Sequence, residues 1–336
     1  MSGDLRANIT IEEVAASAGV SRSTVSRVVN GSTAVSPAAL EAVHRAIQEL
    51  NYVPNRAARS LARRRTLAVA LVVPEDTGRF FGDPFFASVV SGVHARLRRS
   101  EYVLTLFIAS DDPGDKMTSY LSSGSIDGAI IVSHHASDTF VDRIASAVPV
   151  VWGGRPVHES SRDYVVDVDN AAAARTATEY LIGRGCRRIA MIAGPASMPA
   201  GVDRLTGFRT VLEDAGLAPA AIEDGLFTHA GGADAMRRIL ATGAEFDAVF
   251  ASSDLMARGA LGVLAAAGLR VPDDVAVMGF DDSSAATSAE PHLTTMRQPS
   301  FAQGEAMAAT LVDLLEGRSP ARSTIMPTEL VVRESA

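Results

Sequence analysis

The chain has 336 residues, of which 47% are hydrophobic and 21% are charged; this excludes a disordered protein and suggests two or three globular domains. The net charge is −8, but residues 1–65 carry nine Arg against five acidic residues, so a basic head precedes an acidic body and a polyanion is expected to bind at one end. A single cysteine, Cys186, excludes a disulfide framework within the chain, and neither a signal peptide nor a membrane-spanning run is visible, so we expect a cytoplasmic protein without membrane association.

The first 50 residues predict three short helices. A capping box that begins at Thr10 opens the first helix, which should end near Ala18. Ser21 is a suitable cap for a second helix that reaches about residue 30. Ser36 can cap a third helix, with a proline in its first position. Residues 51–65 are basic, are interrupted by a proline and contain few apolar side chains, so they are interpreted as a hinge between head and body.

From residue 66 onward, short apolar strands alternate with helical stretches. Continuous apolar strands are typical of parallel sheets covered by helices on both faces. Repeated strand–helix alternation over more than 200 residues predicts a doubly wound α/β body with two sheets and a cleft between them. The strand candidates are 67–74, 102–109, 128–133, 148–152, 164–168, 188–193, 248–251 and 275–279.

No recognisable enzyme motif is present. The sequence has no G-x-S-x-G, P-loop, H-E-x-x-H or G-x-G-x-x-G pattern, and an adjacent histidine pair at 134–135 has poor geometry for binding one metal ion. We therefore expect no enzymatic activity, no cofactor and no metal site.

The head resembles the DNA-binding domain of the LacI/GalR family of repressors. The shared pattern is V-A-x-x-A-G-V-S-x-x-T-V-S-R-V-x-N, followed by L-N-Y-x-P-N-x-x-A-x-x-L. The body has similar matches in DGAIIVS, RIAMIAGP, ASSDLMARGAL, VPDDVAVMGFDD and PTELVVRES, so the resemblance spans residues 9–335. It implies an all-α helix-turn-helix head on a type I periplasmic-binding-protein-like body, whose two doubly wound subdomains are joined by three crossing strands. It also implies a homodimer.

The resemblance and the chemistry of the second helix together define a DNA-binding set. Arginine can bind guanine through a bidentate pair, and hydroxyl and amide side chains can donate to phosphates. Arg22 and Ser23 occupy the specificity-varying positions of the family, and Arg27 its regular base-reading position. Leu61 matches the apolar side chain that the family inserts into the minor groove, with packing against the body as the alternative. The full set is Ser21, Arg22, Ser23, Thr24, Ser26, Arg27, Asn30, Asn55, Arg56, Ala58 and Leu61.

The resemblance also implies an effector site in the cleft, for which a sugar is the expected ligand. Arg204 in R-L-x-G-F and Asp281 in GFDD match the pair that binds ligand hydroxyls. Ser253 stands where many sugar-binding members have Asn, and Gly154 where several have Asp. The other candidates have structural alternatives, with core packing open for the aromatic residues. The effector set is Phe85, Phe86, His134, Trp152, Arg155, Arg204, Ser253 and Asp281.

The expected regulator binds a pseudo-palindromic operator and is released by a sugar or oligosaccharide. Co-repression by a purine or a sugar phosphate is the first alternative, and a sugar-binding module without regulatory DNA binding is the second. The expected domains are a head at 1–54, a hinge at 55–65 and a body at 66–336. Within the body, one subdomain combines 66–166 with 291–320 and the other 167–290 with 321–336.

Overall fold

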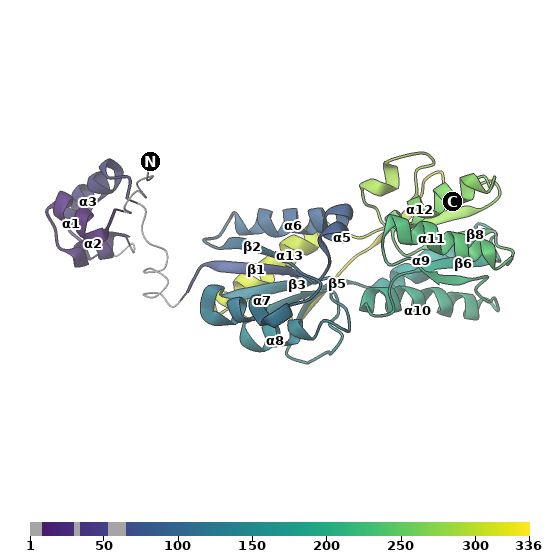
Figure 1. Cartoon of the computed structure of the whole chain (residues 1–336), viewed down its shortest axis with the longest axis horizontal. Helices are drawn as coiled ribbons and strands as arrows, with labels where there is room; N and C mark the ends of the chain where they lie inside the picture. The colour runs from purple at the N-terminus through teal and green to yellow at the C-terminus, as the bar shows by residue number, and fades with distance from the viewer. Residues whose placement is uncertain (1–8, 30–33, 53–64) are drawn as a thin grey trace. The chain divides into compact units, whose positions relative to one another are not determined.

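The computed structural model describes residues 9–29, 34–52 and 65–336, and the chain divides into one compact unit up to Thr66 and another from Leu67 to Ala336. The first unit contains three helices, drawn in purple in Figure 1: α1 (Ile11–Ala18), α2 (Arg22–Val29) and α3 (Pro37–Glu49). Their apolar faces meet in a small core that includes Val14, Val25 and Val43.

Local hydrogen bonds set the ends of these helices. The Thr10 backbone N–H donates to Glu13 Oε2 at 2.7 Å, and the Glu13 N–H donates to Thr10 Oγ1 at 3.3 Å, which completes the expected capping box. The Thr24 N–H donates to Ser21 Oγ at 3.1 Å, and Ser36 accepts from the third residue of α3. The predicted helix starts are therefore confirmed.

The body contains two six-stranded sheets. The first has the order β11-β5-β4-β3-β1-β2 and defines the N-subdomain; the second has the order β12-β10-β9-β8-β6-β7 and defines the C-subdomain. All neighbouring strands are parallel except β10 and β12. The first sheet consists of β1 (Ala68–Val73), β2 (Val103–Ile108), β3 (Gly128–Val132), β4 (Val150–Gly153), β5 (Tyr164–Val168) and β11 (Ser323–Met326). The second consists of β6 (Ile189–Ala193), β7 (Ile222–Asp224), β8 (Ala248–Ala251), β9 (Ala276–Asp281), β10 (Thr294–Arg297) and β12 (Glu329–Val331).

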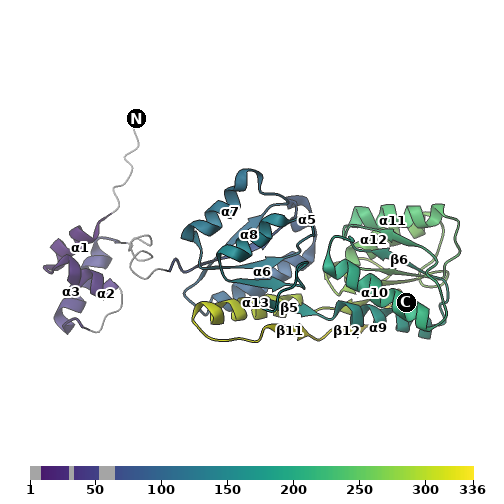
Figure 2. The same ribbon diagram turned by 90° about the horizontal axis from the view of Figure 1, so that it is seen from below.

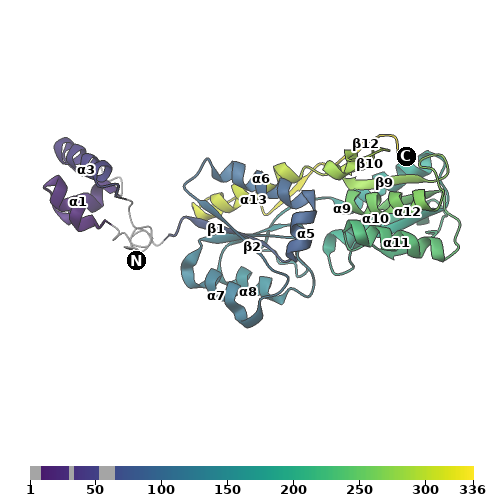
Figure 3. The ribbon, with the colours of Figure 1, turned by 45° about the horizontal axis from the view of Figure 1, so that its top comes forward.

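Helices cover both faces of each sheet, as continuous apolar strands require. Figure 3 shows α6 and α13 on one face of the first sheet and α7 and α8 on the other. In the C-subdomain, α9 and α10 share one core with the sheet, and α11 and α12 share another. The helices are α5 (Thr77–Gly82), α6 (Pro84–Leu97), α7 (Lys116–Tyr120), α8 (Thr139–Ala147), α9 (Asn170–Gly183), α10 (Pro199–Asp214), α11 (His229–Ala241), α12 (Asp254–Ala266) and α13 (Ser300–Leu315). Shorter turns are η1 (Pro113–Asp115), η2 (Leu121–Ser125) and η3 (Ser284–Thr287).

Close helix packing in the C-subdomain depends on glycine. A Cβ added to Gly259 of α12 would lie 2.1 Å from the backbone oxygen of His229 in α11, and one added to Gly232 of α11 would lie 2.4 Å from Met256. The two helix backbones can approach this closely only because neither glycine has a side chain.

The chain crosses between the subdomains three times: from β5 to α9, from β10 to α13 and from β11 to β12. Figure 2 shows the yellow α13 and β11 beside the N-subdomain strands. The last two crossings differ from the sequence expectation, which placed them at 290/291 and 320/321. They lie after Arg297 and after Met326, because β10 pairs with β9 in the second sheet and β11 pairs with β5 in the first. Strands β7, β10, β11 and β12 were not predicted from the sequence.

Candidate functional site

The exposed face of α2 carries the described part of the expected DNA-binding set. Arg27 and Ser23 are exposed, whereas Val25 and Val28 point into the head core. Arg22 forms an ion pair with Glu12 at 2.9 Å, with both side chains more than half exposed. Surface pairs of this kind contribute roughly 0–1 kcal/mol, so the pair leaves Arg22 able to bind a stronger anion.

The hydroxyl side chains at the start of α2 are joined to one another. Ser21 Oγ lies 2.7 Å from Ser23 Oγ and 2.9 Å from Thr24 Oγ1, and Ser26 is partly buried. Ser21 directly precedes α2, and Ser23 and Thr24 lie in its first turn. Hydroxyls at the start of a helix are suited to contact phosphates. The remaining members of the set, Asn30, Asn55, Arg56, Ala58 and Leu61, lie outside the described residues.

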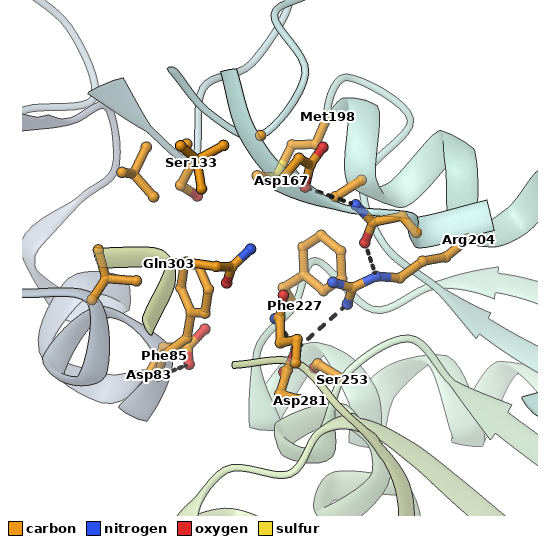
Figure 4. A pocket seen from close by; sticks show the side chains of 18 of the residues that line it. Asp83, Phe85, Ser133, Asp167, Met198, Arg204, Phe227, Ser253, Asp281 and Gln303 are labelled. Atoms are coloured by element: carbon orange, nitrogen blue, oxygen red, sulfur yellow. Dashed lines mark hydrogen bonds and ion pairs between the residues drawn. The ribbon is translucent and has the colours of Figure 1, made fainter. Parts of the chain in front are cut away.

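A cavity of about 700 Å³ lies between the two subdomains, at the carboxyl ends of their strands. Ligands of open α/β sheets bind at this edge, just beyond the carboxyl ends of the strands. Figure 4 shows Asp83, Phe85, Ser133 and Gln303 facing it from the N-subdomain side, and Arg204 and Phe227 from the C-subdomain side.

The floor of the cavity is a buried Arg204–Asp281 pair. The closest Arg204 nitrogen lies 3.6 Å from an Asp281 carboxylate oxygen. Arg204 also donates to Asn170 Oδ1 at 2.9 Å and to the backbone oxygen of Ser252 at 2.6 Å. Its guanidinium carbon lies 3.5 Å from the centroid of the Phe280 ring. These contacts hold the guanidinium in one orientation.

Burial dominates the electrostatics of this floor. It raises the pKa of Asp281 well above its ordinary value, an effect that the nearby Arg204 opposes. It also lowers the pKa of Arg204, again opposed by Asp281. Gln298 Nε2 donates to Asp281 at 2.6 Å. A ligand whose hydroxyls donate to the Asp281 carboxylate is favoured at this floor, because such hydrogen bonds stabilise the charged form of Asp281.

Four of the eight predicted effector residues line the cavity: Phe85, Arg204, Ser253 and Asp281. Ser253 is the N-cap of α12, since its Oγ accepts from the Met256 N–H at 3.3 Å.

The other four predicted effector residues do not line the cavity. Phe86 is 1% exposed and stacks on Phe80 in the core. Successive residues of a strand face opposite sides of the sheet. Gly153 lines the cavity, whereas the side chain of the preceding residue, Trp152, lies in the core on the other side of the first sheet. His134 is buried, and the centroid of its ring lies 5.0 Å from that of Trp152. Burial lowers the pKa of His134 to about 4.

Arg155 is the fourth of these residues, and its side chain points away from the cavity. It bonds Asp203 of the C-subdomain at 2.7 Å and Glu159 at 3.1 Å. Its backbone N–H donates to Asp167 at 3.0 Å.

Several polar residues of the cavity were missed from the sequence. Asn170 lies just after β5, Gln298 follows β10 and Ser133 follows β3, while Asp167 is the second-last residue of β5, so each lies at or just beyond the carboxyl end of a strand. That position is a signal that could have identified them. Asp83 lies in a turn between α5 and α6, and burial raises its pKa.

Family models match the chain in both of its units. Residues 10–55 match the model of bacterial regulatory proteins of the lacI family, and residues 178–336 match a periplasmic binding protein-like domain. The chain is 48% identical to the HTH-type transcriptional regulator CelR of Thermobifida fusca, over 97% of this chain and 98% of the relative. The chain belongs to the lacI family of bacterial regulatory proteins.

Other relatives and solved structures agree with this assignment. The lacI-family chain is 34% identical to the ribose operon repressor of Halalkalibacterium halodurans, over 97% of this chain and 96% of that one. A CelR–cellobiose complex superposes with a TM-score of 0.78 at 44% identity, covering 98% of this chain and all of that one. The lac repressor dimer bound to operator and the anti-inducer ONPF superposes with a TM-score of 0.86 at 27% identity, covering 98% and 99%. The resemblance and the fold class are confirmed, and the chain is a DNA-binding transcription regulator.

The lacI-family body has direct contacts across its cleft. Arg79 of the N-subdomain donates to the backbone oxygen of Leu226 at 2.6 Å. His135 Nδ1 lies 2.8 Å from Ser197 Oγ, and the Ala136 N–H donates to the Ser197 backbone oxygen at 2.8 Å. Together with the Arg155–Asp203 pair, these contacts join the two subdomains around the cavity, an arrangement that we call closed.

Buried Glu75 organises the N-subdomain side of these contacts. Its Oε1 lies 2.9 Å from Arg79 Nε and 3.2 Å from His135 Nε2, and it accepts from Ser133 Oγ at 2.7 Å. Because Glu75 is 6% exposed and contacts both Arg79 and His135, it orients the two side chains that reach across the cleft.

Among the described residues of this lacI-family chain, no group of three His, Cys, Asp or Glu side chains is suited to hold a metal ion. In the same part of the chain, no helix has the length and apolarity needed to cross a bilayer.

Proposed function

We propose that this regulator is a homodimeric repressor that binds a pseudo-palindromic operator and releases it when a neutral sugar occupies the cavity between its subdomains. The Arg204–Asp281 floor is the observation that carries the proposal. A fixed guanidinium can donate to sugar hydroxyl oxygens while the carboxylate accepts from sugar hydroxyls. Phe85 and Phe227 supply apolar faces against which a pyranose ring can pack.

The charges of the lining favour a neutral ligand. The cavity is lined by three carboxylates, Asp83, Asp167 and Asp281, and by two arginines. A phosphate would have to compete with these carboxyl groups for the two guanidinium groups, which disfavours the sugar-phosphate alternative. CelR, which has been solved with cellobiose, supports a glucoside as the first ligand to test.

The proposed mechanism joins the cavity to the head through the two subdomains. Cavity residues come from both sheets, so a ligand that binds both biases the closed arrangement, and this bias is transmitted to the operator-bound heads of the dimer. Couplings of this kind are typically about 1–3 kcal/mol. The lac repressor, solved as a dimer on its operator, supports the two-fold arrangement. A regulator that binds operator DNA would act in the cytoplasm, and no enzymatic step is part of the proposal.

The ligand half of the proposal is tested by the Asp281→Ala variant. A duplex selected by the protein from a random pool serves as operator, and anisotropy measures its release by glucose and by cellobiose. We expect Asp281→Ala to bind the duplex but to lose the sugar response, while Glu179→Ala, at an exposed site on α9, keeps both. An intact sugar response in Asp281→Ala, or release only by purines, would reject the sugar site.

The DNA half is tested by the Arg27→Ala variant. Loss of one base-reading arginine should weaken operator binding by about 1–3 kcal/mol without changing sugar affinity. Arg45→Ala, which removes an exposed arginine of α3 from its pair with Glu41, is the matched control. Equal operator binding by Arg27→Ala and wild type would remove Arg27 from its assigned role.

A further inference from the structure

Gln303 is a buried glutamine on the N-subdomain side of the cavity. It lies on α13 and lines the cavity together with Met307, one helical turn further on, so this face of α13 is turned to the cavity. Gln303 is 6% exposed, and its Oε1 is buried without a hydrogen-bond partner. Figure 4 shows the side chain, and no hydrogen bond reaches it there. The fold therefore encloses this amide without using it.

The other polar side chains of the cavity lining are already hydrogen-bonded within the protein. Asp83, for example, accepts from the Phe85 N–H at 2.9 Å. Among the described residues that line the cavity, Gln303 alone has a polar side chain without such a bond. The bonded lining residues are Arg79, Asp83, Ser133, Asp167, Asn170, Arg204, Ser253, Asp281 and Gln298.

Close helix packing fixes the position of Gln303 at the cavity wall. The next residue, Gly304, packs against α6, where a Cβ added to it would lie 2.3 Å from the backbone oxygen of Val89. A Cβ added to Gly92 of α6 would lie 2.0 Å from the backbone oxygen of Phe301. The two backbones leave no room for α13 to shift toward α6, so the Gln303 amide stays beside the cavity.

An unpaired buried amide has a definite chemical preference. Buried polar groups without a partner are rare in folded proteins, and departures of this kind concentrate at functional sites. An amide can both donate and accept, which matches a hydroxyl group, and it carries no charge to offset that of a phosphate or carboxylate. A site that pairs such a group only with its ligand rejects analogues that lack the hydroxyl, because the group is then left unpaired.

We propose that Gln303 is a specificity-determining residue that binds one hydroxyl of the sugar from the N-subdomain side. The inference rests on the proposed sugar-binding function and adds a selectivity that the charged floor does not supply. Arg204 and Asp281 belong to the C-subdomain, whereas Gln303 belongs to the N-subdomain. A sugar bound by both sets therefore bridges the two subdomains.

The test removes the amide while keeping an apolar side chain of similar size. Gln303→Leu is the main variant, and Gln303→Met, with an unbranched side chain, is the second in case leucine packs poorly. Gln48→Leu, the same replacement at an exposed position on α3 of the head, is the matched control. The full-length proteins are titrated calorimetrically with glucose and cellobiose, and then with the monodeoxy derivatives of whichever sugar binds more tightly. Urea denaturation without sugar measures their stability.

We expect Gln303→Leu to bind the sugar at least about tenfold more weakly than wild type. Without sugar it should unfold at the same urea concentration as wild type or a higher one, because an unpaired buried acceptor has been removed. One monodeoxy derivative should bind wild type at least about tenfold more weakly than the parent sugar does, and should bind Gln303→Leu and wild type with affinities within about threefold. Gln48→Leu should match wild type throughout.

Two results overturn the role of Gln303. One is an unchanged sugar affinity in both Gln303 variants. The other is an equal loss for the parent sugar and for every monodeoxy derivative, which is what a packing defect would produce. Both leave the sugar-sensing function standing, whereas failure of wild type to bind either glucose or cellobiose overturns the proposed function as well.

Discussion

Replacing Asp254 with Asn removes a buried negative charge while keeping the shape of the side chain. Asp254 is fully buried at the start of α12, where it accepts from the Ser283 N–H and from Thr295 Oγ1, each at 2.7 Å. Burial raises its pKa to about 7, although both hydrogen bonds act in the opposite direction. An Asn side chain can keep both bonds, because its carbonyl can accept from Ser283 and its amide can donate to the Thr295 oxygen.

The sign and size of the effect follow from proton linkage. The folded protein keeps the Asp254 proton up to about pH 7, whereas the unfolded chain loses it near its ordinary value of 3.8. The raised pKa therefore makes the contribution of Asp254 to stability fall as the pH rises from about 4 to about 7, and no further change is expected above that. Two pH units within this window correspond to roughly 2–3 kcal/mol, and the full shift to about 4 kcal/mol.

Urea denaturation at pH 5 and at pH 8 measures this contribution. The free energy of unfolding of Asp254→Asn minus that of wild type should increase by roughly 2–3 kcal/mol between the two pH values. Taking the difference cancels the carboxylates that do not interact with Asp254, whereas Asp281, whose pKa the Asp254 charge raises, contributes to the measured difference. Asp234→Asn, which removes an exposed carboxylate of the same subdomain, is the control. A difference that is the same at both pH values would show that Asp254 is charged in the fold at pH 5, and would refute the burial argument.

Three further changes test packing and local bonds. Thr10→Ala should cost about 1 kcal/mol of head stability and reduce the hydrogen-exchange protection of α1 about fivefold; unchanged protection would contradict the capping box. Gly259→Ala should destabilise the body by about 1–3 kcal/mol. Gly262→Ala on the same helix is the control and should not, because a Cβ added there meets no other atom within 4 Å. Equal stabilities of the two variants would contradict the close packing of α11 and α12. Ser197→Ala removes the cross-cleft bond to His135 and should weaken sugar binding about twofold to tenfold without affecting operator binding; unchanged sugar affinity would remove this bond from closure.

Elements set by local or strongly apolar signals could be predicted from the sequence. The head helices begin where Thr10, Ser21 and Ser36 provide caps, and the central strands are continuous apolar runs. The missed strands have three or four residues and carry weak patterns: β11 alternates exposed and half-buried residues, and β12 is a short antiparallel edge strand. Their positions depend on pairing with distant strands, so local periodicity does not identify them.

The site could be predicted only in part for a similar reason. Arg204 and Asp281 lie in recognisable motifs. For two residues that are adjacent in the chain, however, the direction in which each side chain leaves the backbone decides which of them faces the cavity. Phe85 lines the cavity while Phe86 is in the core, and Gly153 lines it while Trp152 does not. Composition and spacing identify such a segment but do not resolve which of two adjacent side chains enters the cleft.

The late crossings of the chain have a consequence for synthesis on the ribosome. The first sheet opens with β1 at Ala68, yet its edge strand β11 ends at Met326, and α13 comes from residues 300–315. The N-subdomain therefore cannot close its core until almost the whole polypeptide has been translated, although its first strand emerges among the earliest parts of the body. Pairing over such sequence distances is slow. During that interval the apolar α6 surface that α13 covers is available to chaperones, so a nascent chain arrested before residue 300 should be a chaperone client while its head has already folded.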